Sequence, residues 1–151
     1  MTNKKNVFEE DCRKEAENVE AYKAAKDAGD EEAMAKARDS HNAHMKELEG
    51  KGKIYCRIFW EYMQSMESGN EYLDIKDTVW DRDVEALITC MRENGVEHFT
   101  FSSTWSSAVE TAWLFTKCGC KLEGLIEINS QIRDFMTGEY EKAHGYLFSL
   151  G

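Results

Sequence analysis

The residues best suited to chemistry form a hydroxyl-rich run between a predicted strand and a predicted helix. The run comprises Ser102, Ser103, Thr104, Trp105, Ser106 and Ser107. Backbone N–H groups at a helix N-terminus favour anions, and α/β sheets bind ligands outside the carboxyl ends of their strands. The run therefore favours a small anion or polar ligand, with Trp105 as a stacking wall. It lacks the Gly residues and the Lys of a phosphate-binding loop, and Ser and Thr are also ordinary helix caps.

A second candidate is a dense acidic run, in which six carboxylates occur beside only Lys76 and Arg82. The six are Glu71, Asp74, Asp77, Asp81, Asp83 and Glu85. One interpretation is a solvated strand edge followed by acids in the first turn of a helix, where the helix dipole favours them. The other is an electronegative partner-binding surface that occupies a basic groove, such as a nucleic-acid channel, by presenting charge where phosphates would lie.

Metal and thiol sites have less support in the sequence. His41 and His44 lie three residues apart on a predicted helix, with Glu47 one turn further on, but the preceding helix has no matching pair of ligands. A solvated or interface face is the favoured interpretation of this pair. Cys118 and Cys120 are separated by one residue, which is too short for the usual zinc or redox spacing. The five cysteines form an odd, scattered set, so we expect reduced thiols, no metal and no cofactor.

Catalytic templates are missing from the sequence. The chain contains no G-x-S-x-G elbow, no H-E-x-x-H and no G-x-G-x-x-G, and it offers no recognisable nucleophile. We therefore expect a protein that is not an enzyme. A small hydrolase or transferase is a third interpretation, because catalytic triads assemble from residues that are distant in sequence.

Composition limits the functions that these residues can serve. The chain has 151 residues, 42% of them hydrophobic, and 19 Lys and Arg against 29 Asp and Glu give a net charge of −10. This length and apolar content fit one compact domain, or a small domain with a helical appendage. The excess of carboxylates disfavours direct binding to nucleic acid and to anionic membranes. It favours a positively charged protein partner.

Targeting and membrane signals are also missing. Residues 1–8 lack the apolar core of a signal peptide, and no window approaches the roughly 18 apolar residues of a membrane span. We therefore expect a cytoplasmic protein.

Helical periodicity dominates the first 68 residues. Two apolar stripes recur at three- and four-residue spacing, and between them Gly29 can end one helix and Asp30 can cap the next. The first stripe is Phe8, Cys12, Ala16, Val19 and Tyr22, and the second is Met34, Ala37, His41, Met45 and Leu48. Because both stripes are narrow, we expect this helical hairpin to gain stability by packing on the rest of the chain or by forming a homodimer. A richer amphipathic helix is predicted over residues 53–67.

The period changes after residue 68, which predicts a helical region over 1–68 and a small α/β domain over 69–151. Strands are expected at 72–75, 98–101, 122–128 and 144–150, with crossover helices at 81–94 and 106–117. This order predicts an α+β or α/β fold with an N-terminal helical hairpin and a sheet of three or four strands. The fourth strand is expected to lie antiparallel beside the third, after a long mobile connection over 129–143.

The stretch from Tyr72 to Asn129, and especially residues 99–110 and 123–129, resembles a domain of small uncharacterised proteins from bacteria and their mobile elements. More generally, a short acidic protein with a helical part and an α/β part is similar to phage-encoded anti-CRISPR proteins. That resemblance implies an inhibitor of a CRISPR effector nuclease or of another nucleic-acid-handling complex, acting in a bacterial cell or a phage-infected host. Together with the acidic run, it implies a basic protein or nucleoprotein complex as the partner. The alternative function is a small-ligand or anion-binding α/β module that uses Ser102 to Ser107.

Overall fold

A computed structural model describes residues 5–77 and 79–151, so residues 1–4 and Thr78 lie outside the described residues. The prediction that residues 1–8 lack the core of a signal peptide therefore concerns four residues that the structure does not describe. The described part contains five helices and four strands. The helices are α1 (Val7–Asp27), α2 (Glu31–Gly50), α3 (Lys53–Glu67), α4 (Asp81–Glu93) and α5 (Ala108–Lys117). The strands are β1 (Leu73–Lys76), β2 (His98–Ser102), β3 (Lys121–Arg133) and β4 (Tyr140–Ser149).

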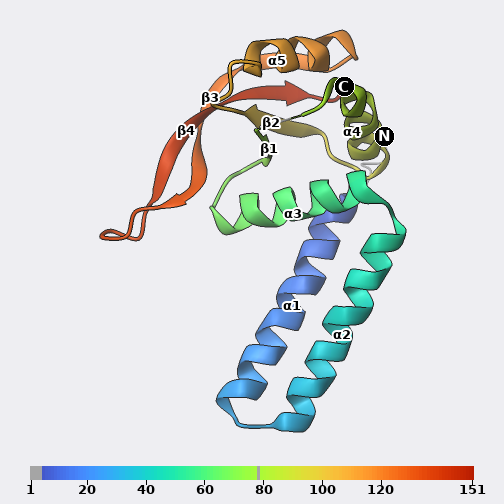
Figure 1. Ribbon diagram of the computed structural model, residues 1–151, viewed down its shortest axis with the longest axis vertical. Helices are drawn as coiled ribbons and strands as arrows, with labels where there is room; N and C mark the ends of the chain where they lie inside the picture. The colour runs from blue at the N-terminus through green and yellow to red at the C-terminus, as the bar shows by residue number, and fades with distance from the viewer. Residues whose placement is uncertain (1–4, 78) are drawn as a thin grey trace.

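A helical hairpin projects from an α/β body (Figure 1). The antiparallel helices α1 and α2 lie side by side and form this projection. Helix α3 lies between the helical hairpin and the sheet, next to β1, whereas α5 lies at the end of the molecule farthest from the helical hairpin. The β3–β4 hairpin extends sideways beyond the helices that cover the sheet (Figure 1).

Side-chain caps define where the first two helices begin. The side chain of Asn6 accepts the N–H of Glu9 at 3.2 Å, and that of Asp30 accepts the N–H of Ala33 at 3.0 Å. Gly29 adopts φ 67° in the turn between the helices, a conformation that Gly reaches without steric cost. The predicted helical hairpin is therefore confirmed. None of the described helices combines the length and the apolar character needed to cross a bilayer.

The strand order of the sheet is β1-β2-β4-β3. Strands β1 and β2 are parallel, with Leu73 beside Phe99 and Lys76 beside Ser102, and α4 connects them. Strand β4 is antiparallel to both of its neighbours, β2 and β3. The α+β fold and the antiparallel fourth strand are thus confirmed. The last strand lies between β2 and β3, so α5 connects two strands that are not neighbours.

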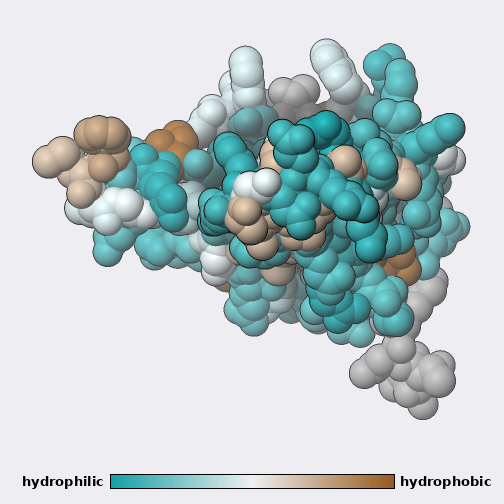
Figure 2. Space-filling model, turned by 90° about the horizontal axis from the view of Figure 1, so that it is seen from below, coloured by the Kyte–Doolittle hydropathy of each residue, from teal (hydrophilic) through white to brown (hydrophobic). Residues whose placement is uncertain are grey.

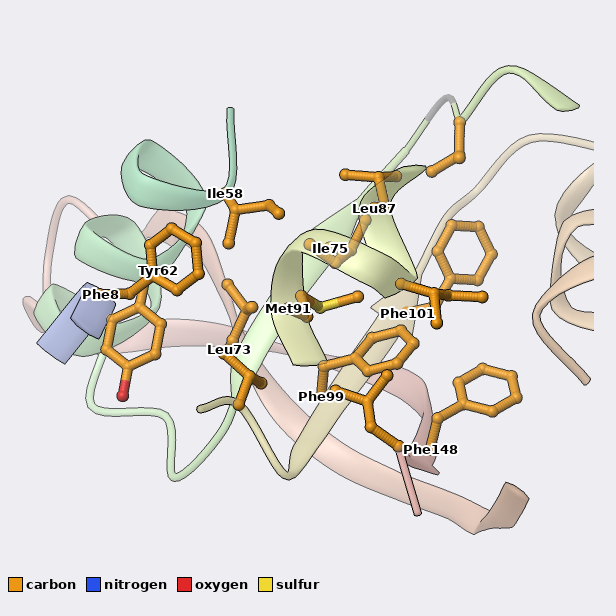
Figure 3. Close-up of a cluster of buried hydrophobic side chains, with 14 of the residues drawn as sticks. Phe8, Ile58, Tyr62, Leu73, Ile75, Leu87, Met91, Phe99, Phe101 and Phe148 are labelled. Atoms are coloured by element: carbon orange, nitrogen blue, oxygen red, sulfur yellow. The ribbon is translucent and has the colours of Figure 1, made fainter. Parts of the chain in front are cut away.

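The core lies mainly on one face of this sheet. Because side chains alternate across a strand, Leu73 and Ile75 of β1 share that face with Phe99 and Phe101 of β2. They pack in one buried cluster with residues of the other elements, including Ile58, Tyr62, Leu87, Met91, Phe115 and Phe148 (Figure 3). The same cluster reaches Phe8 of α1. Packing is therefore continuous across residue 68.

The connection predicted over residues 129–143 is mostly strand. Strand β3 continues to Arg133 and β4 begins at Tyr140, which leaves only residues 134–139 as a turn. Most side chains of this extension are at least partly exposed on both faces of the hairpin. The extension therefore lacks the apolar alternation by which a half-buried strand is predicted from sequence.

Candidate functional site

The acidic run and the hydroxyl-rich run meet where the parallel strands β1 and β2 have their carboxyl ends, and we call this end of the sheet the carboxyl edge. Because β1 and β2 are parallel neighbours, the loops that leave their carboxyl ends emerge side by side. The backbone N–H of Asp77, just after β1, donates to the carbonyl of Ser102, the last residue of β2, at 2.8 Å. Asp77 adopts φ 64°, which is uncommon for a residue other than Gly. The two sequence-predicted sites therefore adjoin each other.

Asp74 lies beneath this edge and not on its surface. Its side chain is buried, and its carboxylate accepts the hydroxyl protons of Thr100 and Ser102, both at 2.7 Å. Its backbone N–H donates to Oγ of Ser65 in α3 at 2.9 Å. Burial raises the pKa of Asp74, although the two hydroxyl donors act in the opposite direction. This corrects the prediction that Asp74 presents charge to a partner, because its carboxylate is a buried acceptor joining β1 to β2.

A second carboxylate, that of Glu61 in α3, lies under the same edge. It accepts hydrogen bonds from Nε of Arg57 at 3.0 Å and from the backbone N–H of Lys76 at 3.3 Å. Burial raises the pKa of Glu61 to about 7, and the negative charge of Asp74 adds to this rise while Arg57 opposes it. Sequence reasoning missed Glu61. The available signal was Arg57 four residues before it, the spacing of a helical ion pair.

The six predicted acids do not form a single surface. Four of them lie at this edge with exposed or partly exposed side chains: Asp77, Asp81, Asp83 and Glu85. Asp81 and Asp83 occupy the first turn of α4, where the helix dipole favours carboxylates. Glu71 is also exposed, but it precedes β1 and therefore lies toward the opposite end of that strand, beside a separate cavity.

Two exposed tryptophans accompany the four acids. Trp80 immediately precedes α4 and Trp105 follows β2, and each is 61% exposed. The guanidinium carbon of Arg82 lies 5.9 Å from the centre of the Trp80 ring. A large apolar ring left in water adjacent to charged groups marks a candidate contact surface. We call the following set the acidic tryptophan surface: Asp77, Trp80, Asp81, Asp83, Glu85 and Trp105.

The hydroxyl-rich run forms a turn whose first two hydroxyls already have partners. Ser102 donates to Asp74, and Oγ of Ser103 accepts the N–H of Trp105 at 3.1 Å. Ser107 directly precedes α5, but its side chain makes no capping hydrogen bond. Anion binding at Ser102 to Ser107 stays a prediction, and the carboxylate beneath the turn acts against it.

The histidines predicted as a weak metal pair belong to a buried hydrogen-bond network between helices. Glu15 of α1 is 2% exposed, and its carboxylate faces Nδ1 of His41 and, at 2.9 Å, Nδ1 of His44. Nε2 of His44 lies 3.5 Å from Asp11, which also accepts the hydroxyl proton of Tyr55. No group of three or more His, Cys, Asp or Glu side chains within residues 5–77 and 79–151 is arranged to hold a metal ion.

The remaining candidate groups are a surface carboxylate and the thiols. Glu47, the third member of the predicted metal set, lies 3.6 Å from Lys14 at the surface. All five cysteines are free thiols. Burial raises the pKa of Cys12 to about 12 and that of Cys120 to about 11, so neither thiol is ionised near neutral pH.

Comparison with known proteins relates most of the chain to one family. Residues 57–150 match a family described as a domain of unknown function, DUF7698. No curated protein and no solved structure matches the chain. The matched segment begins within α3 and includes the whole sheet and the acidic tryptophan surface, but neither helix of the helical hairpin. The chain is a member of the DUF7698 family, with the helices α1 and α2 preceding the family domain.

Proposed function

We propose that this chain is a non-catalytic, acidic binding protein that engages a basic protein or nucleoprotein complex. The observation that carries the proposal is the exposure of Trp80 and Trp105 at the sheet edge that also bears four carboxylates. Trp is enriched among the residues that dominate protein interface energies. Arg and Lys interact favourably with both indole faces and carboxylates. The combination therefore favours a partner surface rich in Arg and Lys.

The proposed mode of action is competition with nucleic acid for a basic groove. Grooves that bind nucleic acid carry clustered Lys and Arg, which contact phosphates. The net charge of −10 would accelerate encounter with such a groove, and the acids of the acidic tryptophan surface would lie where phosphates otherwise lie. The partner class that we propose is a nucleic-acid-handling complex such as a CRISPR effector nuclease, in line with the resemblance to anti-CRISPR proteins.

Matched charge variants and an Arg-rich peptide test the surface. The site variant carries Asp77→Asn, Asp81→Asn and Asp83→Asn. The control carries Glu17→Gln, Glu20→Gln and Asp39→Asn on exposed positions of the helical hairpin, so both variants have the same net charge. We expect the site variant to bind the peptide roughly tenfold more weakly than the control, and binding of the parent to weaken with added salt. Equal affinities of the two variants would overturn the proposal.

A nuclease assay tests the competitive mode. Guide-loaded CRISPR effector nucleases are incubated with the parent chain, the site variant or Trp80→Ala before target DNA is added. The proposal expects the parent to inhibit DNA binding and cleavage, and both variants to inhibit less. If the parent inhibits none of a broad set of effector types, this partner class is wrong, while the peptide experiment still tests the surface itself.

A further inference from the structure

The turn between β3 and β4 presents large apolar side chains to water. Phe135 is 97% exposed, Met136 is 86% exposed, and Ile132 just before the turn is 56% exposed. Figure 2 shows this hydrophobic surface on the hairpin that projects at the left, whereas the helical hairpin facing the viewer is mostly hydrophilic. Apolar residues gathered on a projecting element mark an interaction site.

Hydrogen bonds within the turn hold it in one conformation. The N–H of Asp134 donates to the carbonyl of Glu139 at 2.6 Å, and the N–H of Gly138 donates to the carbonyl of Asp134 at 2.9 Å. The carboxylate of Asp134 also accepts the N–H groups of Met136 and Thr137, at 2.7 and 3.2 Å. An ordered backbone turn loses little conformational entropy on binding, so it presents its two apolar side chains from a fixed place in the fold.

A groove between α1 and α2 has properties that match this turn. Its volume is about 300 Å³, and Val19, which lines it, is 55% exposed although apolar. Tyr22 and Ala37 supply further apolar lining, and Arg38 lies at the same groove. Nδ2 of Asn18, another lining residue, is buried and finds no hydrogen-bond acceptor among the residues that the structure describes. An unpaired buried donor is destabilising unless a partner supplies the acceptor.

The two features complement each other in size, polarity and charge. The groove can accept an aromatic ring against Val19 and Tyr22. Asn18 can donate to a backbone carbonyl of an entering turn once its side chain rotates toward the groove, because its Nδ2 is enclosed in the free chain. Of the charged residues that line the groove, Glu15 is buried against two histidines, whereas Arg38 is exposed. The positive charge of Arg38 therefore suits the carboxylates Asp134 and Glu139 that flank the apolar anchors.

We infer that two copies of this chain form a dimer in which the β3–β4 turn of each copy places Phe135 and Met136 in the α1–α2 groove of the other. We call this arrangement the exchange. Reciprocal exchange closes a two-fold dimer, because each copy supplies one turn and one groove. A lipid surface suits the turn less well, since carboxylates flank the anchors and the whole chain carries a charge of −10. The inference goes beyond the proposed function and uses none of the residues of the acidic tryptophan surface.

Salt distinguishes this association from binding to a basic partner. Two copies that each carry a charge of −10 repel one another, and salt screens that repulsion. Self-association should therefore strengthen as salt is added, whereas binding of the Arg-rich peptide should weaken. The charge variants that test the proposed function leave the turn and the groove unchanged, so either proposal can fail without the other.

Sedimentation equilibrium of the full chain tests the exchange. The parent should form a species of twice 17.4 kDa in moderate salt. The turn variant, Phe135→Ser with Met136→Ser, and the groove variant, Val19→Gln, should each weaken association roughly tenfold or more. Val109→Gln, at another exposed helical valine, is the matched control and should leave association unchanged.

Mixing the two defective variants gives a decisive result. A pair made of one turn variant and one groove variant retains one intact contact, from the groove variant's turn to the turn variant's groove. The mixture should therefore associate more strongly than either variant alone. A parent that stays monomeric in high salt, association that survives the turn variant, or a mixture without rescue would each overturn the exchange.

Discussion

Asn70 and Asn129 exchange two hydrogen bonds at the edge of the sheet. Nδ2 of Asn70 donates to the backbone carbonyl of Asn129 at 2.9 Å, and the backbone N–H of Asn129 donates to Oδ1 of Asn70 at 2.8 Å. The side chain of Asn70 thus takes the place of a neighbouring strand at this point of β3, which is an edge strand. Nδ2 of Asn129 also donates to the carbonyl of Ser68 at 2.7 Å, so the loop after α3 is tied to the β3–β4 hairpin.

The substitution Asn70→Ala should loosen this attachment. It removes both reciprocal hydrogen bonds, so we expect the free energy of unfolding in urea to fall by about 1–3 kcal/mol. Amide exchange at Asn129 should also become faster. Asn42→Ala, on the exposed side of α2, is the control and should change neither quantity appreciably. Equal behaviour of the two variants would show that the side-chain bridge does not stabilise the edge.

Removing the Asp74 carboxylate should destabilise the fold. Asp74→Ala removes the carboxylate that accepts the buried hydroxyl protons of Thr100 and Ser102, so we expect a loss of roughly 3 kcal/mol in thermal or urea unfolding. Asp81→Ala, at an exposed acid of the same run, should cost less than about 1 kcal/mol through the helix dipole. A similar small effect for both would contradict the buried position of Asp74.

Glu61 should make stability decline as pH rises toward neutrality. Its pKa is about 7 in the folded chain, above the ordinary 4.5, because the carboxyl group is buried. The folded state therefore retains a proton that the unfolded state releases, and the stabilisation is full below about pH 4.5 and lost as pH rises through about 7. Across that rise in pH, this group should lower the free energy of unfolding by about 3 kcal/mol.

The substitution Glu61→Gln isolates this contribution. The difference between variant and parent in unfolding free energy should change with pH between about 4.5 and 7, in favour of the variant at the higher pH. Glu67→Gln, at the exposed end of α3, serves as the control. If the Glu61→Gln and parent curves run parallel across this range, the buried carboxyl does not set the pH dependence.

Glu15 should contribute substantially to the stability of the helical hairpin. Glu15→Ala leaves buried His44 without its closest hydrogen-bond partner, so we expect a loss of about 1–3 kcal/mol in urea unfolding, with reduced helical circular dichroism. Glu17→Ala, at an exposed position of the same helix, should be nearly neutral. A nearly neutral Glu15→Ala would mean that apolar contacts alone hold the two helices together.

Periodicity predicted these helices correctly, but it assigned some residues to the wrong face of each helix. The predicted stripes include Ala16 and His41, whereas the structure buries Glu15 and His44 and leaves Ala16 exposed. Hydrophobic patterning treats Glu as a surface residue. The burial of Glu15 depends on imidazoles 26 and 29 residues away, and no local pattern contains that information.

The acidic tryptophan surface, too, could be predicted only in part from the sequence. Local sequence identified the acids around the start of α4 and the turn with Trp105, since both depend on residues close together in the chain. It could not show that Asp77 contacts Ser102, because that hydrogen bond depends on the pairing of β1 with β2. Burial of Asp74 was missed for the same reason, because its carboxylate accepts the hydroxyl protons of Thr100 and Ser102 in the neighbouring strand β2.

The place of β4 in the sheet fixes the order in which a nascent chain can complete it. Once residues up to 102 have left the ribosome, β2 can pair with β1, but its other edge must wait for residues 140–149. During that interval Phe99 and Phe101 lack Phe148, and one side of β2 has unpaired backbone groups. Elongation from residue 103 to 149 is therefore the period in which chaperones, or aggregation with other nascent chains, compete most strongly with folding.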